Sequence, residues 1–298
     1  MNNVLSVQAL TKYYGRLCAL NQVNFTVPSG SVFGILGPNG SGKTTLLGIV
    51  TDVLKPSGGH FTWGDENHRM DRRHIGTLLE TPNFYPYLSA YDNLYLQAAI
   101  RECASSDIDR VLRVVQLYDR RHTPFKTFSL GMKQRLAIAA ALLGDPEIIL
   151  LDEPTNGLDP VGIADIRSLI MEMGQNGKTV LIASHLLDEV EKVCSHVAIL
   201  KQGQLLASGP VAEVLNKGSF VVVSASDVSQ LEKCLIGCPG VEKFQNENGH
   251  FQVVLANGYS VEQLNTYCFA HEVVLNRLEE RKQSLELKFL ELTSGPVK

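Results

Sequence analysis

The stretch Gly37-Pro38-Asn39-Gly40-Ser41-Gly42-Lys43-Thr44 is the starting point for the fold of this chain. It has the spacing G-x-x-x-x-G-K-[ST], in which glycines let the backbone curl so that successive N–H groups point at a bound anion. The apolar run 31–36 before it predicts a buried strand, and the run 45–50 after it predicts the start of a helix. Because a helix N-terminus adds the positive end of its dipole, we expect a phosphate-binding loop here.

Lys43 and Thr44 give this loop a more specific chemistry than an ordinary glycine-rich turn. The lysine amine can reach the β- and γ-phosphates of a nucleotide, and the threonine hydroxyl can ligate Mg²⁺. A chance match of the four specified positions is expected in on the order of one chain in a hundred of this length. The strand–loop–helix setting lowers that chance further, so the sequence predicts a nucleoside-triphosphate site.

Length and composition are those of a globular protein with room for two domains. Of the 298 residues, 44% are hydrophobic and 19% charged, and the net charge of −4 provides no basic field that would favour nucleic acid. The cysteines are scattered and fit a reducing cytosol, and Cys234-x-x-x-Cys238 has no second pair to complete a zinc site. The longest apolar run, 136–143, is too short to cross a bilayer, and the N-terminus has no signal-peptide pattern.

Apolar strands alternate with helical patterns over the first two thirds of the chain. Strands are predicted at 4–9 and 20–27 with a turn at Gly15, and residues 55–71 predict a loop with short strands. Further strands are predicted at 75–79, 148–151, 179–183 and 197–201, and helices at 88–118, 130–143, 163–173 and 186–194. This alternation predicts an α/β fold with a mostly parallel sheet.

Composition shifts near Asn216-Lys217-Gly218, where we place a boundary between a domain at 1–216 and a second domain at 217–298. In the second domain, strands are predicted at 220–224, 241–245, 250–255 and 272–275, and helices at 227–236, 261–270 and 283–292. The order β-α-β-β-α-β predicts a small α+β domain of the ferredoxin-like type with a terminal helix. Its carboxylates form no catalytic cluster, so dimer support or regulation, partner recognition and a stabilising appendage all stay open.

Two carboxylates, Asp152 and Glu153, follow the apolar run 148–151. Ligands gather at the carboxyl ends of parallel strands, where Asp152 can hold Mg²⁺ through water and Glu153 can polarise an attacking water. An acidic pair is common at strand ends and means little alone. Roughly a hundred residues downstream of a phosphate loop, it predicts nucleotide hydrolysis.

Over residues 4 to about 215, the chain resembles the ATP-binding-cassette (ABC) ATPases, the motor subunits of membrane transporters. The resemblance rests on several motifs that stand in the family's order. Besides the phosphate loop and the acidic pair, these are Tyr14 for the aromatic that stacks on adenine, Ser129-Leu130-Gly131-Met132-Lys133-Gln134-Arg135 for the signature, Asn156-Gly157-Leu158-Asp159 for the loop after the catalytic glutamate, and Ser184-His185 for the switch histidine.

The resemblance implies a P-loop cassette fold: a mostly parallel sheet with an N-terminal antiparallel β element and a helical insert at about 86–135. It implies ATP and Mg²⁺ as ligands and a role for each matched residue. The implied catalytic residues are Lys43, Glu153 and His185, and the implied Mg²⁺ ligands are Thr44, Asp152 and Glu80. The implied nucleotide contacts within the chain are Tyr14, Ala19, Gly37, Pro38, Asn39, Gly40, Ser41, Gly42, Lys43, Thr44 and Thr45. The implied contacts across a dimer are made by the signature residues Ser129, Leu130, Gly131 and Met132. Asp159 is the implied residue of the dimer and switch loop.

The resemblance also implies partners. Two cassettes pair head to tail, as a homodimer or heterodimer, with each ATP between the phosphate loop of one and the signature of the other. Separate transmembrane permease subunits bind the pair, which places this chain at the cytoplasmic face of the membrane without a spanning segment of its own. A nucleic-acid partner is not expected. A translation-type or repair-type member of the fold, and a scaffold that binds ATP without hydrolysis, are the rival functions.

The sequence departs from the family pattern at two places. Glu80 stands where the family usually has glutamine, and we expect Glu80→Gln to keep ATP binding and change turnover modestly. In the signature, Leu130 and Met132 replace the commoner glycine and glutamine. Both departures, with the runs 79–86 and 289–293, resemble the exporters of peptide antibiotics such as bacitracin and lantibiotics, which implies export of a peptide antibiotic, drug or lipid-like cargo.

The aromatic stretch Phe84-Tyr85-Pro86-Tyr87-Leu88 follows Glu80 closely. It has two interpretations: a local core beneath the helical insert, or a groove that receives a short helix of the membrane partner, as its place in the family implies. Exposed aromatic side chains are typical of interfaces. If the groove interpretation holds, replacing Tyr85 and Tyr87 with alanine should uncouple ATP hydrolysis from transport without unfolding the chain.

Overall fold

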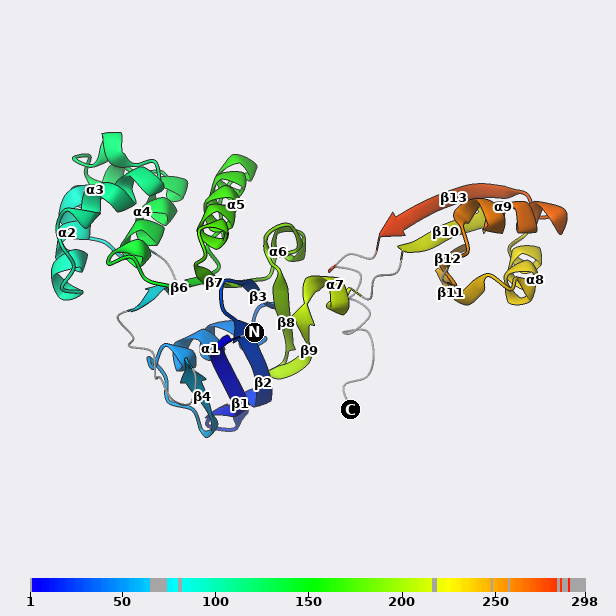
Figure 1. Cartoon of the computed structure of the whole chain (residues 1–298), viewed down its shortest axis with the longest axis horizontal. Coiled ribbons are helices and arrows are strands. Elements are labelled where there is room, and N and C mark those ends of the chain that lie inside the picture. Colours follow the sequence, from blue (N-terminus) through cyan, green and yellow to red (C-terminus); the bar gives the residue numbers. More distant parts are fainter. Residues whose placement is uncertain are drawn as a thin grey trace. The chain divides into compact units, whose positions relative to one another are not determined.

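The computed structural model describes residues 2–64, 74–79, 82–215, 219–247, 249–256, 258–282, 285 and 289. The chain divides into two compact units, one running to Val214 and the other beginning at Leu215 (Figure 1). Each unit has a hydrophobic core of its own. In the part of the chain so described, no helix has both the length and the apolar content needed to cross a bilayer.

A six-stranded sheet runs through the first unit in the order β5-β6-β7-β3-β8-β9. Its strands are β3 (Val32–Leu36), β5 (Ile75–Leu78), β6 (Ile148–Asp152), β7 (Thr179–Ser184), β8 (His196–Lys201) and β9 (Gln204–Pro210). The first five pair in parallel and β9 is antiparallel to β8. The central strands β3, β6 and β7 are buried along their whole length, as expected for parallel strands covered on both faces. The predicted mostly parallel sheet is confirmed.

An antiparallel sheet of β1 (Asn3–Tyr14), β2 (Leu17–Pro28) and β4 (Gly58–Trp63) shares its core with the helix α1 (Lys43–Val50) and the parallel sheet. Leu5 and Val23 of the first sheet and Leu47 of α1 belong to this one cluster. The predicted turn at Gly15 joins β1 to β2, and its φ of 59° lies in the left-handed region that glycine adopts without steric cost. Both strands are several residues longer than predicted.

Helices α2 (Ala90–Ile100), α3 (Asp107–Val114) and α4 (Leu130–Leu142) form a helical layer next to the sheet (Figure 1). The helices α5 (Pro160–Gln175), α6 (Leu187–Val193) and α7 (Val211–Val214) follow β6, β7 and β9. Three of these helices begin at residues whose side chains accept a backbone N–H: Ser89, Ser129 and Asp159. Such caps satisfy donors that a helix leaves without intrahelical partners.

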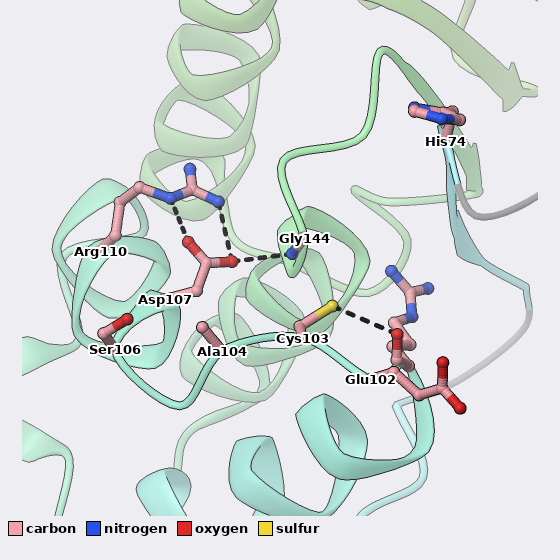
Figure 2. Close-up of a pocket in the computed structure, with 9 residues that line it drawn as sticks. His74, Glu102, Cys103, Ala104, Ser106, Asp107, Arg110 and Gly144 are labelled. Carbon is pink, nitrogen blue, oxygen red and sulfur yellow. Dashed lines mark hydrogen bonds and ion pairs between the residues drawn. The ribbon is translucent and has the colours of Figure 1, made fainter.

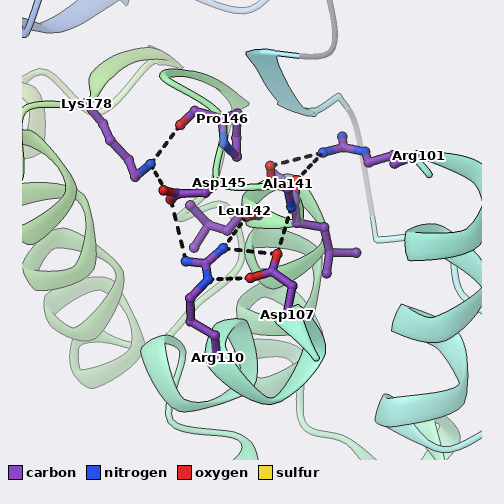
Figure 3. Close-up of polar contacts among 10 residues, drawn as sticks. Arg101, Asp107, Arg110, Ala141, Leu142, Asp145, Pro146 and Lys178 are labelled. Carbon is purple, nitrogen blue, oxygen red and sulfur yellow. Dashed lines mark hydrogen bonds and ion pairs between the residues drawn. The ribbon is translucent and has the colours of Figure 1, made fainter. Parts of the chain in front are cut away.

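Arginine side chains hold the C-terminal end of α4 (Figure 3). Arg101 of α2 donates to the carbonyls of residues 141 and 143 at 3.2 and 3.3 Å, and Arg110 of α3 donates to that of residue 142 at 3.0 Å. Arg110 also pairs with Asp107 and lies 3.6 Å from Asp145, which Lys178 reaches at 2.7 Å. These cations satisfy the last carbonyls of α4 and oppose the negative end of its dipole.

The second unit is a four-stranded antiparallel sheet in the order β11-β12-β10-β13. Its elements are β10 (Ser219–Ala225), α8 (Val228–Gly237), β11 (Val241–Glu247), β12 (His250–Leu255), α9 (Val261–Ala270) and β13 (Leu275–Lys282). This is the β-α-β-β-α-β order that the sequence predicts. Val223, Phe251 and Leu264 are fully buried between the sheet and its two helices.

The last strand of this unit lies later in the chain than predicted. The prediction of 272–275 was wrong: β13 begins at Leu275, and its residues 275–282 pair with β10. The apolar signal came from Val273, which is buried in the core just before the strand begins. The predicted terminal helix at 283–292 lies outside the described residues except for positions 285 and 289, which are helical.

Candidate active site

The loop between β3 and α1 is packed too closely for side chains at two of its glycines, Gly37 and Gly42. A Cβ on Gly37 would lie 2.3 Å from the carbonyl oxygen of Leu200, and one on Gly42 would lie 2.7 Å from that of Ala19. Gly42 also precedes α1 with a φ of 108°. The loop therefore offers backbone N–H groups at the start of a helix, as an anion site requires.

Ser41 supports the interpretation of this loop as a phosphate site. Its hydroxyl is buried, and in the described part of the chain it has no hydrogen-bond partner. A buried polar group without a partner is costly, and an oxygen-rich ligand in the loop would supply one. The donor set of the loop thus fits the phosphates of a nucleotide.

Lys43 is buried under the loop with a side-chain exposure of 6%. Its Nζ donates to the carbonyl oxygens of Gly37 at 2.8 Å and Pro38 at 3.3 Å, and lies 3.2 Å from Oε1 of Glu153. The two carbonyls fix the ammonium at the start of α1, and the carboxylate balances its charge. The sequence predicted each residue but not that they would pair.

Glu153 joins three neighbouring strands through its side chain. It follows β6 with a φ of 46°, and its backbone N–H donates to the carbonyl of Ala183 in β7 at 2.9 Å. Its Oε1 faces Lys43 after β3, and its Oε2 lies 2.8 Å from Nδ1 of His185 after β7. The structure therefore brings the three predicted catalytic residues together at the carboxyl ends of β3, β6 and β7.

Thr44 and Asp152 are the predicted metal ligands that the structure describes. Asp152 is buried at the end of β6, and Thr44 is exposed in the first turn of α1. The described residues contain no group of three His, Cys, Asp or Glu side chains that could hold a metal ion. Mg²⁺ is usually bound by one or two carboxylates with phosphate oxygens and water, so a hydroxyl and one carboxylate fit this ion. Glu80, the third predicted ligand, lies outside the described residues.

Ala19 of β2 borders the loop, and Tyr14 lies at the end of the neighbouring strand β1. Tyr14 ends β1 with its ring 45% exposed, and Nζ of Lys12 lies 5.1 Å from the ring centroid. Ala19 approaches Gly42 closely through its carbonyl oxygen. An exposed aromatic ring of this kind can provide a stacking surface for a base.

The signature residues and Asp159 lie at the N-termini of α4 and α5. Ser129 accepts the N–H of Met132 at 3.3 Å, and Asp159 accepts that of Gly162 at 2.8 Å. The hydrogen bonds and ion pairs that the structure gives Lys43 and Glu153 do not include residues 129–132 or 159. Sequence reasoning missed both capping roles, although Pro160 directly after Asp159 is a typical sign of a helix start.

The aromatic stretch after Glu80 is divided between core and surface. The ring centroids of Phe84 and Phe125 lie 5.2 Å apart in an edge-to-face contact, which is a core contact. Tyr85 and Tyr87 expose 64% and 80% of their surface. The core interpretation therefore holds for Phe84, whereas Tyr85 and Tyr87 are exposed and the interface interpretation stays a prediction for them.

A pocket of about 680 Å³ lies beside α3, apart from the phosphate loop (Figure 2). His74 and Gly144, which precede β5 and β6, line it, so it lies at the amino ends of these strands, away from Lys43. Asp107 in this pocket is held by Arg110 and by the N–H of Gly144 at 2.7 Å. These polar groups bind one another and hold the helical layer together.

The cysteines contribute packing. All six are free, and burial raises the pKa values of Cys194 and Cys268 to about 12. At neutral pH both thiols are therefore protonated and poor nucleophiles.

Comparisons with known proteins identify the family of this chain. Residues 20–156 match the ABC transporter family. The chain is 32% identical to the bacitracin transport ATP-binding protein BcrA of Enterococcus faecalis, over 99% of this chain and 98% of that protein. It is 42% identical to the lantibiotic transport ATP-binding protein SrtF of Streptococcus pyogenes, over 68% of this chain and 89% of that protein.

A solved structure shares the fold. It is a dimeric ATP-binding cassette in a post-hydrolysis state with bound ADP and phosphate. It is 28% identical with a TM-score of 0.61, over 69% of this chain and 98% of that one. With a relative that matches along nearly its whole length, and with Lys43, Glu153 and His185 assembled behind a phosphate loop, this chain belongs to the ATP-binding subunits of ABC transporters, which hydrolyse ATP.

Proposed function

We propose that this chain is the ATP-hydrolysing motor of an exporter whose separate permease subunits carry a peptide antibiotic, a drug or a lipid-like molecule. The observation that carries the proposal is the contact of Glu153 with both Lys43 and His185. The cargo class is inferred from the full-length similarity to a bacitracin transport protein. The residues of this chain that face the nucleotide do not themselves select a cargo.

When ATP enters the loop, Lys43 releases the carboxylate of Glu153 and binds the β- and γ-phosphates instead. The released carboxylate then orients a water for attack on the γ-phosphate and accepts its proton. His185, already in contact with Glu153 at 2.8 Å, holds the γ-phosphate and keeps the water in line. Thr44 and Asp152 would hold Mg²⁺, with Glu80 as a further ligand, and the ion would supply positive charge to offset that of the phosphate oxygens.

Two cassettes pair head to tail around the two ATP molecules, as a homodimer or with a sister cassette. Ser129 and the N-terminus of α4 address the γ-phosphate held by the other chain, because this helix directs the positive end of its dipole there. A dimeric cassette among the solved structures of similar fold supports the arrangement. Loss of the γ-phosphate removes these bridging contacts, and the pair opens.

Tyr85 and Tyr87 receive a short segment of the permease at the cytoplasmic face of the membrane. Both side chains are largely exposed, whereas Phe84 beside them is packed on Phe125. Replacing the two tyrosines with alanine should therefore uncouple ATP hydrolysis from transport without loss of folding. Unchanged transport in the double variant would argue against this surface.

The test of the proposal compares ATP turnover in the wild-type chain and in Glu153→Gln, with size-exclusion chromatography in Mg-ATP. We expect turnover in the wild type, and loss of turnover with an ATP-stabilised dimer in the variant. Thr45→Ser, which keeps a hydroxyl in the first turn of α1, is the control for folding and binding. A Glu153→Gln variant that hydrolyses at the wild-type rate would refute the assignment.

A further inference from the structure

Leu130 makes a contact that a glycine at this signature position could not make. Its side chain remains 48% exposed, yet Cδ2 lies only 3.1 Å from where a Cβ on Gly157 would be. Gly157 has a φ of 74° and no side chain, so the leucine methyl lies directly against its backbone. The signature of this chain therefore contacts the loop that follows its own Glu153.

Leu158 makes a second contact between the same two segments. Its Cδ2 lies 3.9 Å from the Cβ position on Gly131, and its Cβ lies 3.3 Å from that on Gly162. Leu158 thus lies between the first turns of α4 and α5. The leucines of the two segments are placed reciprocally, each beside a glycine of the other.

The loop is tied to Glu153 by two successive turns of the backbone. The N–H of Asn156 donates to the carbonyl of Glu153 at 3.1 Å, and that of Leu158 donates to the carbonyl of Thr155 at 3.3 Å. Thr155 is only 8% exposed, so its surroundings leave this turn little room to move. A backbone shift at Glu153, such as release of its carboxylate from Lys43 would allow, is therefore passed to residues 157 and 158.

We propose that Leu130 is a positioning residue that couples the loop after Glu153 to the signature of the same chain. The inference rests on the proposed head-to-tail pair, in which Glu153 and the signature of one chain serve two different ATP molecules. The Leu130–Gly157 contact then links the two sites, so that the state of one ATP sets the position of the signature on the other. Coupling of this kind appears as cooperativity in ATP.

The test measures ATP turnover against ATP concentration for wild type, Leu130→Ala, Leu130→Met and Val161→Ala. Alanine keeps the helix propensity of the first turn but cannot reach Gly157, whereas methionine can. Val161 is the matched control because it is 69% exposed in the first turn of α5. We expect the Hill coefficient to fall from about two toward one in Leu130→Ala only, because the pair has two sites.

A merely structural role for Leu130 would lower the melting temperature or the maximum rate and leave the Hill coefficient unchanged, and that result overturns the inference. A Hill coefficient of one in the wild type overturns it as well. Size-exclusion of Glu153→Gln with and without Leu130→Ala separates this inference from the proposed function. An ATP-stabilised dimer in both proteins, with cooperativity lost in Leu130→Ala, supports coupling. If Glu153→Gln alone forms no dimer in ATP, the head-to-tail pairing itself is contradicted.

Discussion

Replacing Glu153 with glutamine should tighten the binding of ATP to the single chain, apart from its effect on hydrolysis. Glu153 lies 3.2 Å from Nζ of Lys43, with the two side chains 21% and 6% exposed. ATP must displace this carboxylate before the lysine can bind phosphate. Removing the negative charge removes the competitor and keeps the size of the side chain.

The size of the effect follows from the geometry. Two unit charges at this separation attract by about 5 kcal/mol at an effective dielectric constant of about 20. The net contribution of a hydrogen bond to a charged group is smaller, about 1.5–3 kcal/mol. Because glutamine keeps part of that hydrogen bond, we take the lower end, and a gain of about 1.4 kcal/mol corresponds to about tenfold tighter binding.

The assay is a titration of wild type and variants with a fluorescent, non-hydrolysable ATP analogue, at protein concentrations where size-exclusion shows a single chain. Glu153→Asp separates the two possible causes, because its shorter side chain keeps the negative charge near the phosphates but withdraws from Lys43. We expect it to bind more tightly than wild type as well. Equal affinity of wild type and Glu153→Gln would refute the competition, and tightening in Glu153→Gln alone would assign it to repulsion of phosphate.

Three further predictions concern other parts of the first unit. Tyr14→Ala should weaken ATP binding by about 1–3 kcal/mol while Tyr14→Trp restores it, because base stacking is lost and regained; equal affinities of all three proteins in the same titration would exclude stacking. Gly76→Ala should destabilise the chain by about 3 kcal/mol in urea unfolding, because the new Cβ would lie 2.0 Å from a backbone carbonyl of α4, whereas Gly58→Ala, with 3.7 Å to its nearest neighbour, should change little. The hydrogen bond from Lys178 lowers the pKa of Asp145, so its stabilisation is present above the unfolded pKa and lost as the pH falls through the folded value. The melting temperature of Lys178→Met should therefore fall less than that of the wild type when the pH drops below about 4. Identical pH profiles of the two proteins would show that the pair contributes nothing to stability.

The sequence predicts the elements that are buried on both faces better than those at an edge. The centres of β6 and β7, residues 148–151 and 180–183, contain only apolar residues, and no solvated face disturbs the signal. β9 was missed because it is only half buried and pairs on one side. β13 was misplaced because most of its residues are charged and only Leu275 and Leu278 are apolar. Its pairing with β10 is a long-range property that no local pattern contains.

The same distinction applies to the site. Lys43, Glu153 and His185 were found because their motifs are local, but the hydrogen bonds that join them depend on strands far apart in the chain. The replacement of the usual signature glycine by Leu130 was visible in the sequence as a departure from the family. The contact of Leu130 with Gly157 could not be predicted from the sequence, because it joins the first turn of one helix to a loop 27 residues later.

Arg101 and Arg110 hold the C-terminal end of α4, so a tilt of this helix displaces mainly its N-terminal end. Its 13 residues span about 20 Å from the carbonyls held by Arg101 and Arg110 to the signature at the other tip. With the base as pivot, a swing of about 5° displaces the tip by about 1.7 Å, which is enough to break a hydrogen bond. A small tilt of α2 or α3, imposed by a partner protein, would thus become a larger displacement of residues 129–132 at the other end of α4.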